Sequence, residues 1–153
     1  MPANKVDSDH FLKNNAPPLV VFDGDCLLCN ATVQKILNHE KTEELYFTTL
    51  NSALGKSILE IMQHQHMQAP DSILFLKDGK IYTRSAAVKS ILDYMNGFAF
   101  LKFLLKILPL WFCDIFYRLI AKSRFFIFGK NKSCFVPPST WAHRFMTSSS
   151  QFL

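Results

Sequence analysis

The sequence predicts an α/β fold in which short strands alternate with amphipathic helices, followed by a basic, aromatic-rich helical extension. Three observations support this class. Leu19–Phe22 is a short, wholly apolar run, typical of a strand that is covered on both faces. Apolar residues at helical spacing follow it, and Asp78-Gly79 separates two β-rich runs further along the chain. Together these patterns predict the element order β-α-β-α-β-β-α within residues 19–97.

The length and composition fit one globular domain. The chain has 153 residues, of which 49% are hydrophobic and 19% charged, and these fractions argue against disorder over most of the length. We see no internal repeats. The predicted division is a flexible N-terminal arm (1–18), a core (19–97), a helical extension packed on the core (98–134) and a loose tail (135–153), part of which Trp141 and Phe145 can hold in place.

The first half of the core contains two strand-helix units. The strand Leu19–Phe22 ends at Asp23-Gly24-Asp25, which has the composition of a turn. The apolar side of the first helix consists of Cys29, Val33, Ile36 and Leu37. Leu45–Leu50 is the next strand, and Ser52 is a suitable cap for a second helix. The apolar side of that helix consists of Leu54, Ile58, Ile61 and Met62.

The second half of the core begins with a predicted hairpin. Asp78-Gly79 supplies the two positive-φ residues of a type I′ turn between Ser72–Lys77 and Lys80–Thr83. Ser85 is then a good N-cap for a third helix. The apolar side of this helix consists of Val88, Ile91, Leu92 and Met95.

The extension is strongly basic. Residues 98–153 hold eight Lys and Arg side chains against Asp114 alone, a net charge of +7, whereas residues 1–97 have a net charge of −2. Residues 98–128 also carry two apolar helical stripes separated by Pro109. The extension either contacts a membrane surface as an amphipathic anchor or packs its apolar stripes on the core and leaves its cations in water. Charge alone does not predict nucleic-acid binding, which we do not expect.

The expected location is the cytoplasm, with peripheral membrane contact as an option. The first eighteen residues lack the apolar stretch of a secretory signal. The longest apolar run, Ile107–Cys113, is far shorter than a membrane-spanning helix requires. In a reducing compartment, the four cysteines are catalytic or metal-binding more often than they form a structural disulfide framework. Cys113 lies on an apolar stripe and is predicted to be a core residue, whereas Cys134 is predicted to be an inert thiol.

Cys26 and Cys29 form a C-x-x-C pair at the predicted start of the first helix. This spacing places both side chains on one helix face, within reach of a disulfide. Unpaired N–H groups and the helix dipole stabilise a thiolate in a first turn. We therefore predict Cys26, expected to be the more exposed sulfur, as the nucleophile and Cys29 as the resolving thiol. No bound cofactor is expected.

Charged neighbours are predicted to tune this dithiol. Asp23 and Asp25 disfavour a further negative charge, which favours a reductant or isomerase over a strong oxidant. Asp25 can instead act as the N-cap of the helix, and Asp23 can relay a proton to or from Cys29. Arg84, which follows the hairpin, can offset the two carboxylates or be an ordinary surface residue.

Two alternatives to redox catalysis stay open. In the first, the cysteines belong to a metal site completed by residues such as His39, His64 or His66, although a structural zinc site usually has two such closely spaced ligand pairs. In the second, the protein acts at a membrane surface through residues 98–128 and the dithiol has lost its role.

The stretch from Val21 to Cys29, VFDGDCLLC, resembles the signature of the DCC family of thiol-disulfide oxidoreductases. The similarity continues through Asp71-Ser72, the segment Tyr82–Ala87, and Tyr117–Cys134 with its Ala121, Arg124 and Gly129. The resemblance spans roughly residues 19–134. It implies a thioredoxin-like βαβ-α-ββα core, a redox dithiol at Cys26 and Cys29, and a disulfide-containing protein or small thiol as substrate, with an unknown electron donor.

The chain departs from the family pattern at two positions. Leu27 stands where the family often has proline, which is expected to alter the helix start and the redox poise. Thioredoxins also carry a cis-proline before their third strand. The equivalent position here is Asp71, and Pro70 comes one residue early.

Overall fold

A four-stranded mixed sheet forms the centre of the protein. The computed structural model describes residues 13, 16–67, 73–130 and 136–146. The strand order is β2-β1-β3-β4, in which β1 and β2 are parallel and the other neighbours are antiparallel. The strands are β1 (Leu19–Phe22), β2 (Tyr46–Thr49), β3 (Leu74–Lys77) and β4 (Lys80–Thr83).

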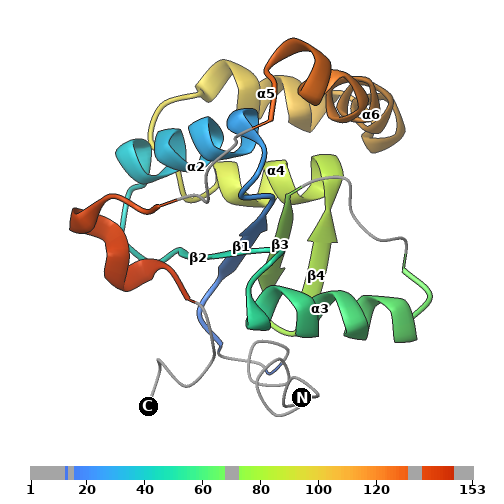
Figure 1. Cartoon of the computed structure of the whole chain (residues 1–153). Coiled ribbons are helices and arrows are strands. Elements are labelled where there is room, and N and C mark those ends of the chain that lie inside the picture. The colour runs from blue at the N-terminus through green and yellow to red at the C-terminus, as the bar shows by residue number, and fades with distance from the viewer. Residues whose placement is uncertain (1–12, 14–15, 68–72, 131–135, 147–153) are drawn as a thin grey trace.

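Three helices cover the two faces of this sheet. They are α2 (Leu27–His39), α3 (Ala53–His64) and α4 (Arg84–Leu92). Helix α3 covers one face, and α2 and α4 cover the other (Figure 1). All four residues of β1 are buried, and alternate residues join the two hydrophobic clusters on opposite faces. The predicted α/β order and the doubly covered first strand are confirmed.

Two local predictions in the core are also confirmed. The Ser52 side chain accepts a hydrogen bond from the Gly55 amide at 2.9 Å and caps α3. Asp78 and Gly79 have φ angles of 49° and 74°, as a type I′ turn requires. Gly55 also has a packing role, because a Cβ there would lie 2.2 Å from the Thr49 carbonyl oxygen.

The start of α4 differs from its prediction. Thr83 is the N-cap residue and makes no side-chain cap hydrogen bond, whereas Ser85 is buried inside the first turn. The Ser85 hydroxyl donates to Asp114, and its amide donates to the same carboxylate oxygen at 3.4 Å. The prediction of Ser85 as N-cap was therefore wrong, because a carboxylate of the extension serves the first turn of α4.

The extension forms two helices, α5 (Ala99–Ile107) and α6 (Leu110–Ile127), on the outer side of α2 and α4 (Figure 1). Leu105 and Phe125 pack against the core, and Cys113 is buried as predicted. Helix α5 nevertheless has no buried residue, and α6 buries only Cys113 and Arg124. Within the described residues, no helix is long and apolar enough to cross a membrane.

Residues 136–146 are not loose, because Trp141 and Phe145 pack on the core, which is the alternative that the sequence left open. They include a 3-10 helix, η1 (Ser139–Arg144), which returns to the sheet. The Phe145 ring stacks on Phe47 with centroids 5.4 Å apart, and the Met146 amide donates to the Phe47 carbonyl at 2.7 Å. Arg144 is 2% exposed and pairs with the buried carboxylate of Glu40. Aromatic packing and a buried ion pair thus fix this segment.

Candidate active site: the dithiol at the start of α2

A tight turn after β1 positions the two cysteines. The Cys26 amide donates to the Asp23 carbonyl at 3.3 Å, and the Asp25 amide donates to Asp23 Oδ1 at 3.0 Å. From one turn into α2, Asn30 Nδ2 donates to the Gly24 carbonyl at 3.0 Å. These backbone and side-chain bonds hold the turn against the helix and fix the position of Cys26.

The two thiols interact across the first turn of α2. Cys26 is the N-cap residue, and its Sγ accepts a hydrogen bond from the Cys29 amide at 3.4 Å. Both cysteines are free thiols, and the Cys26 side chain lies close enough to Cys29 to raise the pKa of the Cys29 thiol. The predicted juxtaposition at a helix start is therefore present. Its geometry suits two sulfurs that exchange between the dithiol and disulfide states.

Two predictions about this turn were wrong. Asp25 is not the N-cap, because Cys26 occupies that position, and the exposed Asp25 carboxylate instead accepts from Asn51 Nδ2 at 3.3 Å. Cys26 is not the more exposed sulfur residue, since it is 0% exposed and Cys29 is 6% exposed. The chain after α6 contributes to this cover, because the backbone of Lys130 pairs with that of Cys26.

Arg124 is the cation that the structure places at the dithiol. Its guanidinium donates to Cys29 Sγ at 3.5 Å and to Asp23 Oδ2 at 3.2 Å. The residue is buried, and it links the end of α6 to the turn after β1. It lies four residues after Ile120, on the apolar stripe of α6. A cation where an apolar residue is expected was the signal that could have identified it.

The predicted role of Arg84 remains a prediction. This residue is half-buried and begins α4 with a φ of 52°. Its charge is not among the causes that shift the pKa of Cys29, whereas that of Arg124 is.

Burial controls the acidity of Cys29. The pKa of its thiol is raised from 9.0 to about 12, first by burial and then by the hydrogen bond to Cys26 and the Cys26 charge. Arg124 lowers this pKa and Asp23 adds to the increase. Cys29 is therefore protonated at neutral pH. This state suits a resolving thiol that reacts only after its surroundings have changed.

The raised pKa of Cys29 predicts a loss of stability in alkali. The folded state binds this proton more tightly than the unfolded chain, so the contribution is complete below pH 9.0 and disappears as the pH rises through about 12. We expect the free energy of unfolding to fall more steeply over that range in the wild type than in Cys29→Ala, by a few kcal/mol in total. Denaturant titrations at several alkaline pH values measure both slopes. Equal slopes would contradict the assignment, because the lysine and tyrosine titrations are common to both proteins.

The metal alternative requires further ligands beside the two cysteines. Among the residues it describes, no three His, Cys, Asp or Glu side chains are close enough together to hold a metal ion. His39 instead contacts its own helix, with Nδ1 2.9 Å from the Lys35 carbonyl oxygen, and its ring packs on Phe98. Cys134, Pro70 and Asp71 lie outside the described residues.

The fold and the dithiol together define the class. A β2-β1-β3-β4 sheet with a C-x-x-C pair at the start of the helix after β1 is the arrangement of a thioredoxin-like protein. Residues 20–130 match the family described as DCC1-like thiol-disulfide oxidoreductase. The chain belongs to this family.

Two curated proteins are similar over most of the chain. "DCC family protein At1g52590, chloroplastic" of Arabidopsis thaliana is 31% identical over 132 residues, covering 84% of this chain and 74% of the relative. "Uncharacterized protein YuxK" of Bacillus subtilis (strain 168) is 34% identical over 128 residues, covering 84% and 93%. No solved structure matches the chain.

Proposed function

We propose that the protein catalyses thiol-disulfide exchange with Cys26 and Cys29, and that it reduces disulfides of proteins or small molecules. The observation that carries the proposal is the pair of neighbouring free thiols at the start of α2, with the Arg124 guanidinium on the inner sulfur. Membership in the DCC1-like family supports the same reaction class. No cofactor is required, because the two sulfurs carry the exchanged electrons.

The proposed reaction has two steps. The Cys26 thiolate attacks one sulfur of the substrate disulfide, which forms a mixed disulfide and releases the first substrate thiol. Cys29 Sγ then attacks Cys26 Sγ, and the second substrate thiol leaves. The substrate gains two electrons and two protons, and the protein is left with a Cys26–Cys29 disulfide. A dithiol or thiol donor reduces this disulfide for the next cycle, as a reducing compartment such as the cytoplasm supplies.

The second step requires removal of the Cys29 proton. Once Cys26 is in a mixed disulfide, its negative charge and its hydrogen bond no longer raise the pKa of Cys29. Arg124 then favours the thiolate through its contact with Cys29 Sγ. We assign proton acceptance to Asp23, whose carboxylate is partly buried and pairs with the same guanidinium.

Access to Cys26 requires a local rearrangement. Cys26 is fully buried, and the Lys130 backbone pairs with the Cys26 backbone. A Cβ added at Gly129, the residue before Lys130, would lie 3.9 Å from the Leu27 side chain. The segment at Gly129 and Lys130 therefore lies along the start of α2. In the proposed cycle the backbone pairing at Lys130 opens when a substrate chain approaches. A substrate backbone can then take its place beside Cys26.

A redox titration tests the proposal. The protein is equilibrated in thiol-disulfide buffers of different potential, then quenched in acid and alkylated for mass spectrometry. We expect one two-electron transition and an intramolecular disulfide between Cys26 and Cys29. The matched control Cys113→Ala removes a buried cysteine of α6 and should retain this transition. Absence of a Cys26–Cys29 disulfide at every potential would reject the proposal.

A further inference from the structure

The α5–α6 surface, made by the exposed side chains of α5 and α6, has an unusual set of large apolar residues. Phe100 is 77% exposed, Trp111 is 66% exposed and Phe126 is 94% exposed. So many exposed apolar side chains on two neighbouring helices mark an interaction surface, because monomeric proteins rarely expose large contiguous apolar patches. The other exposed apolar residues of the α5–α6 surface are Leu101, Phe103, Leu104, Ile107, Leu110, Ile115, Phe116, Leu119 and Ile120.

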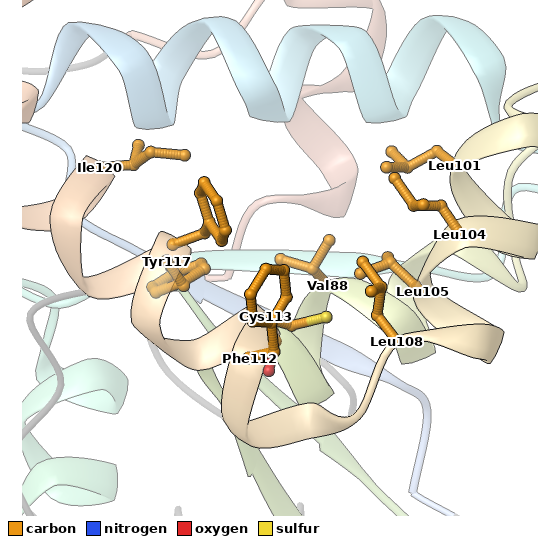
Figure 2. Close-up of a pocket in the computed structure, with 11 residues that line it drawn as sticks. Val88, Leu101, Leu104, Leu105, Leu108, Phe112, Cys113, Tyr117 and Ile120 are labelled. Atoms are coloured by element: carbon orange, nitrogen blue, oxygen red, sulfur yellow. The ribbon is translucent and has the colours of Figure 1, made fainter.

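An apolar recess adjoins the α5–α6 surface. A cavity of about 410 Å³ lies between α4, α5 and α6 (Figure 2). Leu101 and Leu104 of α5 line it from one side and Phe116 and Ile120 of α6 from the other, and these four residues are themselves exposed. The recess lies between the two helices, and its exposed lining residues also belong to the α5–α6 surface.

The charge of this face has one sign. Lys106, Arg118 and Lys122 are exposed, and neither of the two ion pairs among the described residues involves them. The single carboxylate of residues 98–153, Asp114, is hydrogen-bonded to Ser85 on α4. Cations thus stand beside apolar side chains on a face that carries no other acidic group.

We propose that the α5–α6 surface docks on an anionic membrane. Exposed Phe, Leu and Trp side chains insert at the boundary between headgroups and acyl chains, while Lys and Arg contact the anionic headgroups. A second copy of this chain fits less well, because a symmetric pair would bring two like-charged basic faces together. The α5–α6 surface lies on the outer side of α2 and α4, away from α3 (Figure 1), so docking leaves α3 in water.

Vesicle flotation of the full chain tests the docking. We expect binding to phosphatidylcholine vesicles that contain phosphatidylglycerol, weak binding to phosphatidylcholine alone, and release at high salt. Lys106→Gln/Arg118→Gln should lower the partition coefficient by roughly tenfold or more. Phe103→Gln/Trp111→Gln should lower it as well. The matched control Lys56→Gln/Lys80→Gln removes two exposed cations from α3 and β4 and should bind like the wild type, as should Cys26→Ser, since docking is independent of the dithiol.

Fluorescence gives a second readout. The chain has two tryptophans, so Trp141→Phe leaves Trp111 as the only reporter, and its emission should shift to the blue and be quenched by brominated lipid. Equal partitioning of Lys106→Gln/Arg118→Gln and the control Lys56→Gln/Lys80→Gln would overturn the proposal. So would unshifted Trp111 emission with anionic vesicles, or a concentration-dependent dimer that buries Trp111 without lipid.

Discussion

Replacing Cys26 by serine is expected to abolish disulfide reductase activity. A serine hydroxyl keeps the size of the side chain and can still accept the Cys29 amide hydrogen bond, but it is not ionised at neutral pH and cannot form the mixed disulfide. The rate of reduction of insulin or of an aromatic disulfide should fall by roughly three orders of magnitude or more, to that of the thiol donor alone. Activity equal to that of the wild type would remove the proposed nucleophile.

Cys29→Ser separates the two steps of the same reaction. Cys26 can still attack, but no resolving thiol follows, so the mixed disulfide should accumulate and be visible by mass spectrometry. Cys113→Ser is the matched control, because it changes a buried cysteine that has no part in the proposed reaction, and its activity should be retained. Failure of Cys29→Ser to trap any substrate would show that Cys29 is not the resolving thiol.

Arg144→Met is expected to cause the largest loss of stability. The Arg144 guanidinium pairs with Glu40, and its Nε and Nη2 donate to the Leu45 carbonyl at 2.9 and 2.7 Å. Both side chains of the ion pair are 2% exposed. Removing the cation leaves a buried carboxylate with only backbone partners, which costs about 3–5 kcal/mol of unfolding free energy. Urea denaturation at neutral pH measures this loss.

Two further variants test the cause of this loss. Glu40→Gln/Arg144→Met removes both charges, so it should recover a part of the stability that the single variant loses. Arg118→Met removes an exposed arginine of α6, and its effect should lie within about 0.5 kcal/mol. A small effect of Arg144→Met would show that the carboxylate is rehydrated and that η1 contributes little to the fold.

The sequence pattern was sufficient for most of the core. Apolar periodicity located the strands and helices, and Asp78-Gly79 defined the hairpin, because these signals are local. The tail was not predictable in the same way. Glu40 and Arg144 are 104 residues apart, and no local pattern indicates that a polar C-terminal segment brings a cation to a buried carboxylate. The N-cap of α4 was assigned to the wrong residue for the same reason, since Asp114, which serves its first turn, comes from another helix.

The candidate site was predictable in its chemistry and not in its surroundings. The C-x-x-C spacing and its position after an apolar strand identified Cys26 and Cys29. Their burial and the contact with Arg124 depend on how the end of α6 returns to the turn after β1, which is a tertiary property. Reasoning from neighbours in the sequence therefore offered Asp25 as a helix cap and did not identify Arg124 as a cation at the dithiol.

The N-cap role of Cys26 makes one backbone amide sensitive to the redox state of the dithiol. The same sulfur accepts the amide hydrogen bond of Cys29 and is the proposed site of bond formation. Any disulfide at this atom removes electron density from the acceptor and reorients its lone pairs, which weakens the hold on that amide. The hydrogen-exchange rate and the chemical shift of the Cys29 amide should therefore change on oxidation, and NMR can measure both without an added probe.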